Sequence, residues 1–401
     1  VYVAVSACVF LGPFRTLQGK PTFTMRILSL LLLAPFGFGV ALGQALEIEI
    51  DLTATEVLSQ GQTGTCWSFS TTSFLESEVF RISGELQDLS EMAAVRVIYP
   101  EKAERFVRYQ GKHQFGPGGL CHDVIHAAAV YGLIPQSAYQ GGQEPGAYNH
   151  GELDAMLEAM VQTILKQSGS ISPASFDAIE ATLDAYLGPL PLEFEVNGKT
   201  VTPIQWRDQL GIHPSEYVSL TSFTHHPFGQ EFILEVPDNH AHGAFLNVPL
   251  DDLEATVNNA LDQGYTVAWD ADVSNKGFSF RNGWAIMPET AKTSEEWKTL
   301  DAMPAEPTVD QAARQRDFDS QSTTDDHLMH IVGRAKDAQG RSYFIIKNSW
   351  GDGNAFEGRQ FVSMEYFRHY TVGVMLHSDG LPASVAKMRP QPAKKSAKKG
   401  K

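Results

Sequence analysis

The sequence predicts an α+β fold, in which helices occupy the first half of the chain and strands the last third. Apolar residues recur with helical spacing in the stretches 66–81, 121–131, 153–164 and 176–186. Apolar, β-branched and aromatic residues dominate the stretches predicted as strands, which are 265–273, 328–334 and 342–347. A run of helices followed by a run of strands is typical of α+β proteins.

Turn and capping residues bound the predicted helices. Gly84 is expected to end the first helix, and Gly132 is expected to end the second with a left-handed residue. Asp251 and Glu254 have the spacing of a capping box and are expected to start a later helix. The helices and strands are therefore separated by recognisable stop and start signals.

The composition predicts one folded, acidic domain with a basic end. The chain has 401 residues, of which 43% are apolar, and a formal net charge of −16. That charge argues against nucleic acid as a partner, because phosphate binding requires a basic surface. The folded domain is expected over 44–382. Within it, 277–288 is predicted to form a hairpin, and the polar stretch 289–322 is predicted to lie on the surface. The Lys-, Ala- and Pro-rich stretch 383–401 is predicted to be a disordered basic tail.

The N-terminal region predicts export. Met25 stands near an apolar run, 27–40, which is too short to span a bilayer as a stable helix. Small residues at Ala41 and Gly43 then suit a signal-peptide cleavage site. We therefore expect an exported protein with no membrane span in the mature chain, an upstream extension at 1–24 and a signal peptide at 25–43.

Residues that can carry nucleophilic chemistry lie far apart in the sequence. Cys66 opens the first predicted helix, whose positive end lowers the pKa of a thiol, and Gln60 precedes it by six residues. A predicted strand carries His327 and His330, and Asn348 follows the next strand. A thiolate activated by an imidazole is one arrangement used in covalent catalysis. Either histidine can be the base, and the two point to opposite faces of a strand because their separation is odd.

The stretch from Gln60 to Trp67 and the later Asn348-Ser349-Trp350-Gly351 resemble the papain-like cysteine peptidases. The segments 202–220 and 247–250 resemble those of one branch, the bleomycin hydrolase and aminopeptidase C peptidases. The resemblance implies a two-lobed papain-like fold, with a helical lobe that begins at Cys66 and a β-barrel-like lobe that carries His327. The active site is expected in the cleft between the lobes, and 150–235 is then a branch-specific insertion.

The resemblance also implies a role for each residue of the site. Cys66 would be the nucleophile and His327 the base, because the family places its histidine six residues before a glycine. Asn348 would accept the ring N–H of His327 and fix its tautomer. Gln60 would hold the oxyanion together with the Cys66 backbone N–H. Gln62 is the rival of Gln60, and the six-residue offset of the family selects Gln60.

Substrate binding is assigned by the same resemblance. Gly118 and Gly119 match a glycine pair whose backbone pairs with an extended peptide. Trp67 and Trp350 are assigned with them. The ring of Trp350 is also expected to keep water away from the hydrogen bond between His327 and Asn348.

The chain is therefore expected to be a cysteine peptidase that acts on peptides, with aminopeptidase C-like activity. The alternatives are a papain-like endopeptidase and a catalytically silent papain-like binding protein. The branch restricts its cleft with a C-terminal arm and assembles as a homo-hexamer, but the Lys-rich end of this chain departs from that arm, so exo- or endopeptidase action stays open. No cofactor or metal is expected. The remaining histidine groups lack metal-ligand patterns and are interpreted as surface features: His122 and His126, His225 and His226, and His240 and His242.

Overall fold

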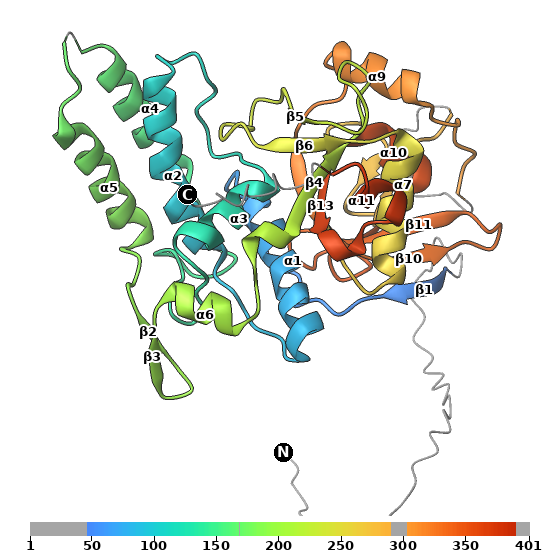
Figure 1. Cartoon of the computed structure of the whole chain (residues 1–401), viewed down its shortest axis with the longest axis horizontal. Helices are drawn as coiled ribbons and strands as arrows, with labels where there is room; N and C mark the ends of the chain where they lie inside the picture. The colour runs from blue at the N-terminus through green and yellow to red at the C-terminus, as the bar shows by residue number, and fades with distance from the viewer. Residues whose placement is uncertain (1–45, 168, 290–302, 390–401) are drawn as a thin grey trace, which may run out of the picture. The chain divides into compact units, whose positions relative to one another are not determined.

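The computed structural model describes residues 46–167, 169–289 and 303–389 (Figure 1). The expected upstream extension at 1–24, the signal peptide at 25–43 and the end of the basic tail lie outside these residues. In the part of the chain that is described, no helix has both the length and the apolar composition needed to cross a membrane.

Helices form one lobe of the protein. Figure 1 shows α2, α4, α5 and α6 grouped on the side away from the large sheet. The helices of this lobe are α1 (Cys66–Ser83), α2 (Glu91–Arg108), α3 (Cys121–Val130), α4 (Gly151–Leu165), α5 (Pro173–Leu187) and α6 (Pro203–Gln209). A short hairpin of β2 (Phe194–Val196) and β3 (Lys199–Val201) leads from α5 to α6.

Terminal residues and apolar faces explain these helices. α1 is buried over most of its length and ends at Gly84, whose φ of 75° is a left-handed conformation that glycine adopts without strain. α2 begins after Ser90, whose side chain accepts a hydrogen bond from the Ala93 N–H. The buried positions of α4 and α5 recur at helical spacing and are Leu153, Leu157, Val161, Ile164, Ile179, Leu183 and Leu187.

A mixed sheet forms the second lobe. Among the described residues it has 11 strands in the order β5-β6-β4-β13-β7-β10-β11-β12-β9-β8, and β1 pairs with β10. The pairs β4–β6 and β12–β9 are parallel, and the other pairs are antiparallel. The strands are β1 (Glu47–Asp51), β4 (Tyr217–Thr221), β5 (Glu231–Ile233), β6 (Ala244–Asn247), β7 (Val267–Ala271), β8 (Phe278–Ser279), β9 (Trp284–Ala285), β10 (His327–Lys336), β11 (Ser342–Lys347), β12 (Arg359–Ser363) and β13 (Thr371–His377).

Helices complete this second lobe and bury one face of its sheet. Apolar side chains of α7, α10 and α11 share a core with the central strands, around Trp269 of β7 and Phe344 of β11. The helical elements here are α7 (Leu250–Asp262), α9 (Gln311–Asp319), α10 (Met364–Tyr370), α11 (Ala383–Ala386) and the short 3₁₀ turns η1 (Pro214–Glu216) and η2 (Ser378–Gly380). The predicted α+β fold is thus confirmed.

The two lobes meet where α1 packs against β7 and β10. Ser70 Oγ donates a hydrogen bond of 2.7 Å from α1 to the carbonyl oxygen of Met329. Ser73 Oγ lies 2.9 Å from His330 Nδ1. Both contacts are buried, so they hold the N-terminal half of α1 in a fixed position relative to the start of β10.

The stretch 289–322, predicted to lie on the surface, is mostly exposed or half-buried where it is described, but it also contains a helix with one buried side. Its last part forms α9, and the Arg314 side chain on this helix is almost fully buried. Arg314 donates hydrogen bonds to the carbonyl oxygens of Ser222 and Arg368, at 2.8 and 3.1 Å. Backbone carbonyls thus accept hydrogen bonds from Nε and Nη1 of the buried guanidinium, whereas its Nη2 has no hydrogen-bond partner among the described residues.

Two predicted boundaries are also wrong. The helix expected to start at a capping box starts at Leu250, after Pro249, with no side-chain cap. Asp251 and Glu254 instead each accept a hydrogen bond of 2.8 Å from Arg368. The expected disordered tail begins too early, because α11 lies at its start and Val385 on that helix is fully buried.

Candidate active site

Cys66 is the first residue of α1 and lies beside the start of β10. Its side chain is only 8% exposed. The backbone N–H of Leu328 forms a hydrogen bond to the sulfur, which places the thiol next to His327 in the fold. The first N–H groups of a helix have no acceptor within the helix, so the Cys66 N–H is free to bind a ligand atom.

His327 is held by the amide of Asn348. His327 Nε2 lies 2.8 Å from Asn348 Oδ1. The backbone N–H of Ser349 donates to the same oxygen over 2.7 Å, and Asn348 Nδ2 donates to Gln360 Oε1 over 2.7 Å. These contacts orient the amide oxygen toward the ring, so His327 carries its proton on Nε2. Its Nδ1 is left as a proton acceptor.

Trp350 covers this hydrogen bond on its solvent side. Its ring stacks on the His327 ring with 4.5 Å between centroids and 29° between planes. The indole is 38% exposed, and Phe278 and Phe280 pack edge-on against it. Trp350 thus lies where the sequence predicted, between solvent and His327.

Burial opposes a charge on either reactive group by itself. It raises the pKa of Cys66 to about 12 and lowers the pKa of His327 to about 4. A proton transferred from Cys66 to His327 would create adjacent opposite charges, whose attraction offsets the desolvation of both. The Leu328 N–H and the positive end of α1 also favour the thiolate.

Gln60 is buried and oriented by two hydrogen bonds. Its Oε1 accepts from Ser349 Oγ over 2.6 Å, and its Nε2 donates to the carbonyl oxygen of Thr63 over 2.7 Å. A primary amide has two hydrogens, so one N–H of Gln60 is left for another acceptor. The backbone N–H of Gln60 also donates to the Ser349 carbonyl over 2.8 Å, which ties this loop to the segment after Asn348.

Sequence reasoning missed the partners that orient the predicted residues. Ser349 lies inside the quoted Asn-Ser-Trp motif, so its position was visible although its contact with Gln60 was not. Gln360 is fully buried on β12, and nothing in the local sequence distinguishes it from another strand residue.

The two rival residues are placed elsewhere. His330 is fully buried, contacts Ser73 and packs edge-on against Phe74. Among the described residues, no hydrogen bond joins His330 to Asn348. Gln62 is exposed, and its Oε1 accepts from Asn149 Nδ2 over 3.3 Å. The structure therefore brings together Gln60, Cys66, His327 and Asn348.

The loop that carries Gly118 and Gly119 rests on Trp67. The Trp67 ring is fully buried, and its Nε1 donates to the Pro117 carbonyl over 2.9 Å. A Cβ atom on Gly119 would lie 3.1 Å from the indole. Trp67 thus supports the glycine pair from inside the lobe and presents no surface to a ligand. This corrects its assignment to substrate binding.

A carboxylate lies against the other glycine. A Cβ atom on Gly118 would lie 1.9 Å from Asp238 Oδ2, so any side chain there would displace the Asp238 carboxyl. Gln114 Nε2 donates to Asp238 Oδ1 over 3.0 Å, and Lys102 Nζ donates to the Gly118 carbonyl. Asp238 belongs to the loop 234–243, between β5 and β6, which no sequence signal connected with the site.

The histidine groups differ from one another in the structure. His240 is buried and its Nε2 lies 3.0 Å from Asp123 Oδ1, so its interpretation as a surface feature is wrong. His126 is half-exposed and its Nε2 lies 3.0 Å from Glu101.

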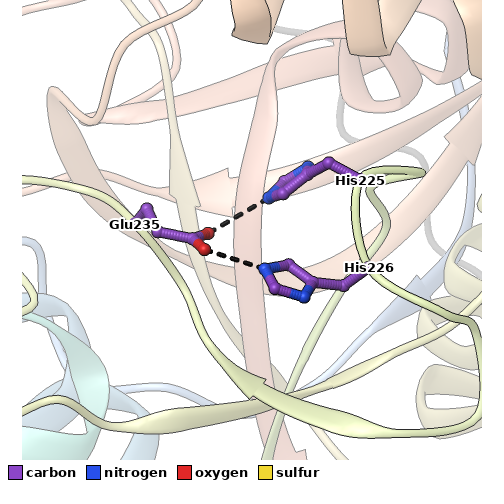
Figure 2. Close-up of side chains that lie close together, drawn as sticks. All are labelled: His225, His226 and Glu235. Atoms are coloured by element: carbon purple, nitrogen blue, oxygen red, sulfur yellow. Dashed lines mark hydrogen bonds and ion pairs between the residues drawn. The ribbon is translucent and has the colours of Figure 1, made fainter.

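Figure 2 shows the rings of His225 and His226 next to each other and both facing the Glu235 carboxylate, with Nε2 to oxygen distances of 3.1 and 2.8 Å. Their nearest ligand atoms lie within 4.8 Å of one another, a spacing compatible with a metal. However, Gln315 Nε2 donates to His225 Nδ1 over 3.1 Å, while its Oε1 accepts from the Thr224 N–H. His225 therefore keeps its proton on Nε2, the atom that a metal would need, and the group is a hydrogen-bonded surface cluster.

Comparisons with known proteins agree with this geometry. The model of the peptidase C1-like family matches residues 194–396, and the model of the papain family cysteine proteases matches residues 48–101. The two matches include the segments that carry Cys66, His327 and Asn348.

Individual relatives cover most of the chain. Aminopeptidase G of Lactobacillus delbrueckii subsp. lactis is 22% identical over 373 residues, which is 82% of this chain and 82% of that protein. Aminopeptidase C of Streptococcus thermophilus is 23% identical, with 83% of each chain covered. The crystal structure of PepW from Lactobacillus rhamnosis HN001 superposes with a TM-score of 0.67 and 18% identity, and covers 85% of this chain and 84% of that one.

Proposed function

Because the chain belongs to the peptidase C1-like family and is a cysteine-type peptidase, we propose that it removes residues from the free N-termini of peptides. One observation carries the chemical part of this proposal. His327 Nε2 lies 2.8 Å from an Asn348 oxygen that two further hydrogen bonds orient, which leaves Nδ1 of a nearly buried imidazole as the base for Cys66.

The reaction proceeds by acyl transfer to sulfur. His327 Nδ1 takes the proton of Cys66, and the sulfur attacks the carbonyl carbon of the peptide bond. The carbonyl oxygen gains a negative charge, which the Cys66 N–H and the free N–H of Gln60 hold. His327 then gives its proton to the departing amine, and the carbon–nitrogen bond breaks. Water, deprotonated by His327, cleaves the thioester and releases the N-terminal residue.

Action at the N-terminus is supported by the relatives named as aminopeptidases. Such an enzyme must distinguish a free α-ammonium from an amide nitrogen. The distinction requires negative charge close to the nucleophile, and carboxylates do lie on the side of Cys66 where Gly118 is found.

Digestion of one peptide in two forms tests the proposal. The wild-type enzyme and Cys66→Ala are incubated with a peptide that carries a free N-terminus and with its N-acetylated form, and the products are followed by mass spectrometry. We expect stepwise loss of N-terminal residues from the free form, slow or no cleavage of the acetylated form, and no cleavage by Cys66→Ala. Rapid internal cleavage of the acetylated form would indicate an endopeptidase. Absence of any cleavage, with Cys66 unreactive toward a thiol-directed epoxide, would indicate a silent binding protein.

A further inference from the structure

The position of a bound α-ammonium is set by covalent geometry. In any amino acid the nitrogen is two bonds from the carbonyl carbon, which puts them about 2.5 Å apart. When the carbonyl carbon of an N-terminal residue is within reach of Cys66 Sγ, its ammonium must therefore lie within a few ångströms of the same sulfur. Groups that select a free N-terminus have to be neighbours of Cys66.

Asp270 is such a neighbour. On β7 it faces Leu328 of β10, the residue whose N–H contacts the Cys66 sulfur. Ala268, two residues before it, is part of the core beneath α1, and alternate residues of a strand share a face, so Asp270 points toward α1. The carboxyl is only 3% exposed, and none of the described residues donates a hydrogen bond to either of its oxygens.

Asp325 and Asp238 complete an acidic group around this position. The Asp270 carboxyl contacts that of Asp325, and the charge of Asp238 acts on both. All three charges act on the Cys66 thiol, Asp270 pairs with Leu328 across the strands, and Asp325 precedes His327 by two residues, so the three carboxyls lie on the side of the nucleophile where β7 and β10 meet. Burial and their mutual repulsion raise the pKa of Asp270 well above its usual range and that of Asp325 to about 7. The buried oxygens of Asp270 and Asp325 have no hydrogen-bond partner among the described residues, so this group is suited to binding a cation.

Among the described residues, Lys102 is a cation near these carboxyls, and it already has a hydrogen-bond partner. Lys102 is buried, its charge acts on Asp238 more than on Asp325, and its Nζ donates to the Gly118 carbonyl. Lys102 therefore belongs with Asp238 and the glycine loop. Neither Asp270 nor Asp325 has a lysine or arginine within ion-pair distance among the described residues.

The loop 234–243 is fastened in place. Asn239 Nδ2 donates to the carbonyl oxygens of Leu234 and Gly243, at 2.9 Å each, and closes the loop on itself. The loop also contacts α3, where His240 Nε2 lies 3.0 Å from Asp123 Oδ1. The carboxylate at its tip is thus held against Gly118, where the backbone of a longer peptide would otherwise run.

We propose that Asp238, Asp270 and Asp325 form the subsite that binds the α-ammonium of the substrate's N-terminal residue. The inference rests on the proposed aminopeptidase function and names the residues that give it its specificity. The ammonium supplies the cation that Asp270 and Asp325 lack. Asp238 closes the path along Gly118, so that a chain extending beyond the N-terminal residue meets a carboxylate instead of a free backbone edge. An acetylated nitrogen is a neutral amide and is larger than an ammonium group, so it neither offsets the charge of the carboxyls nor fits beside Asp238.

The test compares each enzyme with itself on two substrates. Leucyl-coumarin amide and its N-acetyl form are assayed with the wild type, Asp238→Asn and Asp270→Asn. We expect either substitution to lower kcat/KM for the free amine by about tenfold or more, because a charge-assisted hydrogen bond is lost. Cleavage of the acetylated substrate is expected to stay constant or to rise. The ratio of kcat/KM for the free substrate to that for the acetylated substrate is measured on one preparation of each variant. A partly unfolded fraction lowers both values equally and leaves this ratio unchanged.

Controls separate this subsite from the catalytic centre. Glu158→Gln removes an exposed carboxylate of α4 and should keep the wild-type ratio. The rate of epoxide labelling at Cys66 should be the same in all these variants. If Asp238→Asn and Asp270→Asn keep the wild-type ratio while the wild type cleaves the free amine, the subsite is refuted and the aminopeptidase function stands. The substitutions could also lower kcat/KM for acetyl-arginyl-coumarin amide as much as for the free leucyl amine. In that case the carboxyls recognise a basic side chain and not the α-ammonium, which also refutes the proposal. If the wild type cleaves neither leucyl substrate, both proposals fail together.

Discussion

Removal of the Ser349 hydroxyl should slow catalysis without weakening substrate binding. Ser349 Oγ donates a 2.6 Å hydrogen bond to Gln60 Oε1 in a buried position. In Ser349→Ala the Gln60 amide is held only by its bond to Thr63, and its second N–H is no longer aimed at the oxyanion. A buried neutral hydrogen bond contributes about 1–1.5 kcal/mol, which corresponds to about a five- to thirteenfold lower kcat. KM should be unchanged, because the oxyanion exists only near the transition state.

A double-mutant cycle makes this prediction specific. Gln60→Ala alone should lower kcat by about 10²- to 10³-fold, as expected for the loss of an oxyanion donor. In the Gln60→Ala background Ser349→Ala should have almost no further effect, because the group that it orients is absent. Ser77→Ala is the matched control, since it also removes a hydrogen bond of a buried serine, 2.8 Å from Ser77 Oγ to the Thr53 carbonyl oxygen, in the half of α1 that is distant from Cys66.

Steady-state kinetics on an aminoacyl-coumarin substrate, together with a thermal melt of each variant, measures these effects. The reasoning is refuted if Ser349→Ala lowers kcat equally in the wild-type and Gln60→Ala backgrounds, or if Ser77→Ala lowers kcat as much as Ser349→Ala.

Other perturbations follow from the same structure. Trp350→Ala removes the ring stacked on His327 and should lower kcat about three- to tenfold with little change in melting temperature. Arg314→Leu leaves buried carbonyls of Ser222 and Arg368 without a donor and should lower the free energy of unfolding by about 3 kcal/mol in urea titrations; a loss below about 1 kcal/mol would contradict it. Burial lowers the pKa of His150 to about 4, below its unfolded value of about 6.5, so the unfolded state binds the proton first and stability falls as the pH drops from about 6.5 to 4. In His150→Gln the free energy of unfolding should fall less over this pH range, by on the order of 3 kcal/mol. Identical pH profiles of the unfolding free energy in wild type and variant would refute the lowered pKa of His150.

The sequence was sufficient for the parts of the site that depend on local patterns and motif spacing. Periodicity indicated that Cys66 starts a helix and that His327 and His330 lie on a strand, as the structure has them. An odd separation on a strand puts the two histidines on opposite faces but does not say which of them is the base, so the choice of His327 came from its six-residue offset to Gly333, which the family shares.

The remainder depends on contacts between distant segments. Asp238 lies against Gly118 only because the loop 234–243 folds over α3, and Asp270 sits in a strand that looks like any buried strand. The polar stretch that became α9 looked like a surface segment, because nothing in its own sequence reveals that carbonyls of other elements satisfy Arg314. Asp251 and Glu254 have capping-box spacing, but Arg368 from α10 is their partner.

Alkylation of Cys66 as a function of pH tests the central claim most directly, namely that His327 takes the proton of this thiol. Wild type and His327→Ala are treated with iodoacetamide and modification is mapped by mass spectrometry, which separates Cys66 from the buried Cys121. We predict rapid labelling of the wild type at pH 6, and labelling of His327→Ala slower by about 100-fold or more at that pH, because burial and the nearby carboxylates raise the pKa of the thiol when no imidazole takes its proton. Equal labelling rates in the two proteins at pH 6 would contradict the account.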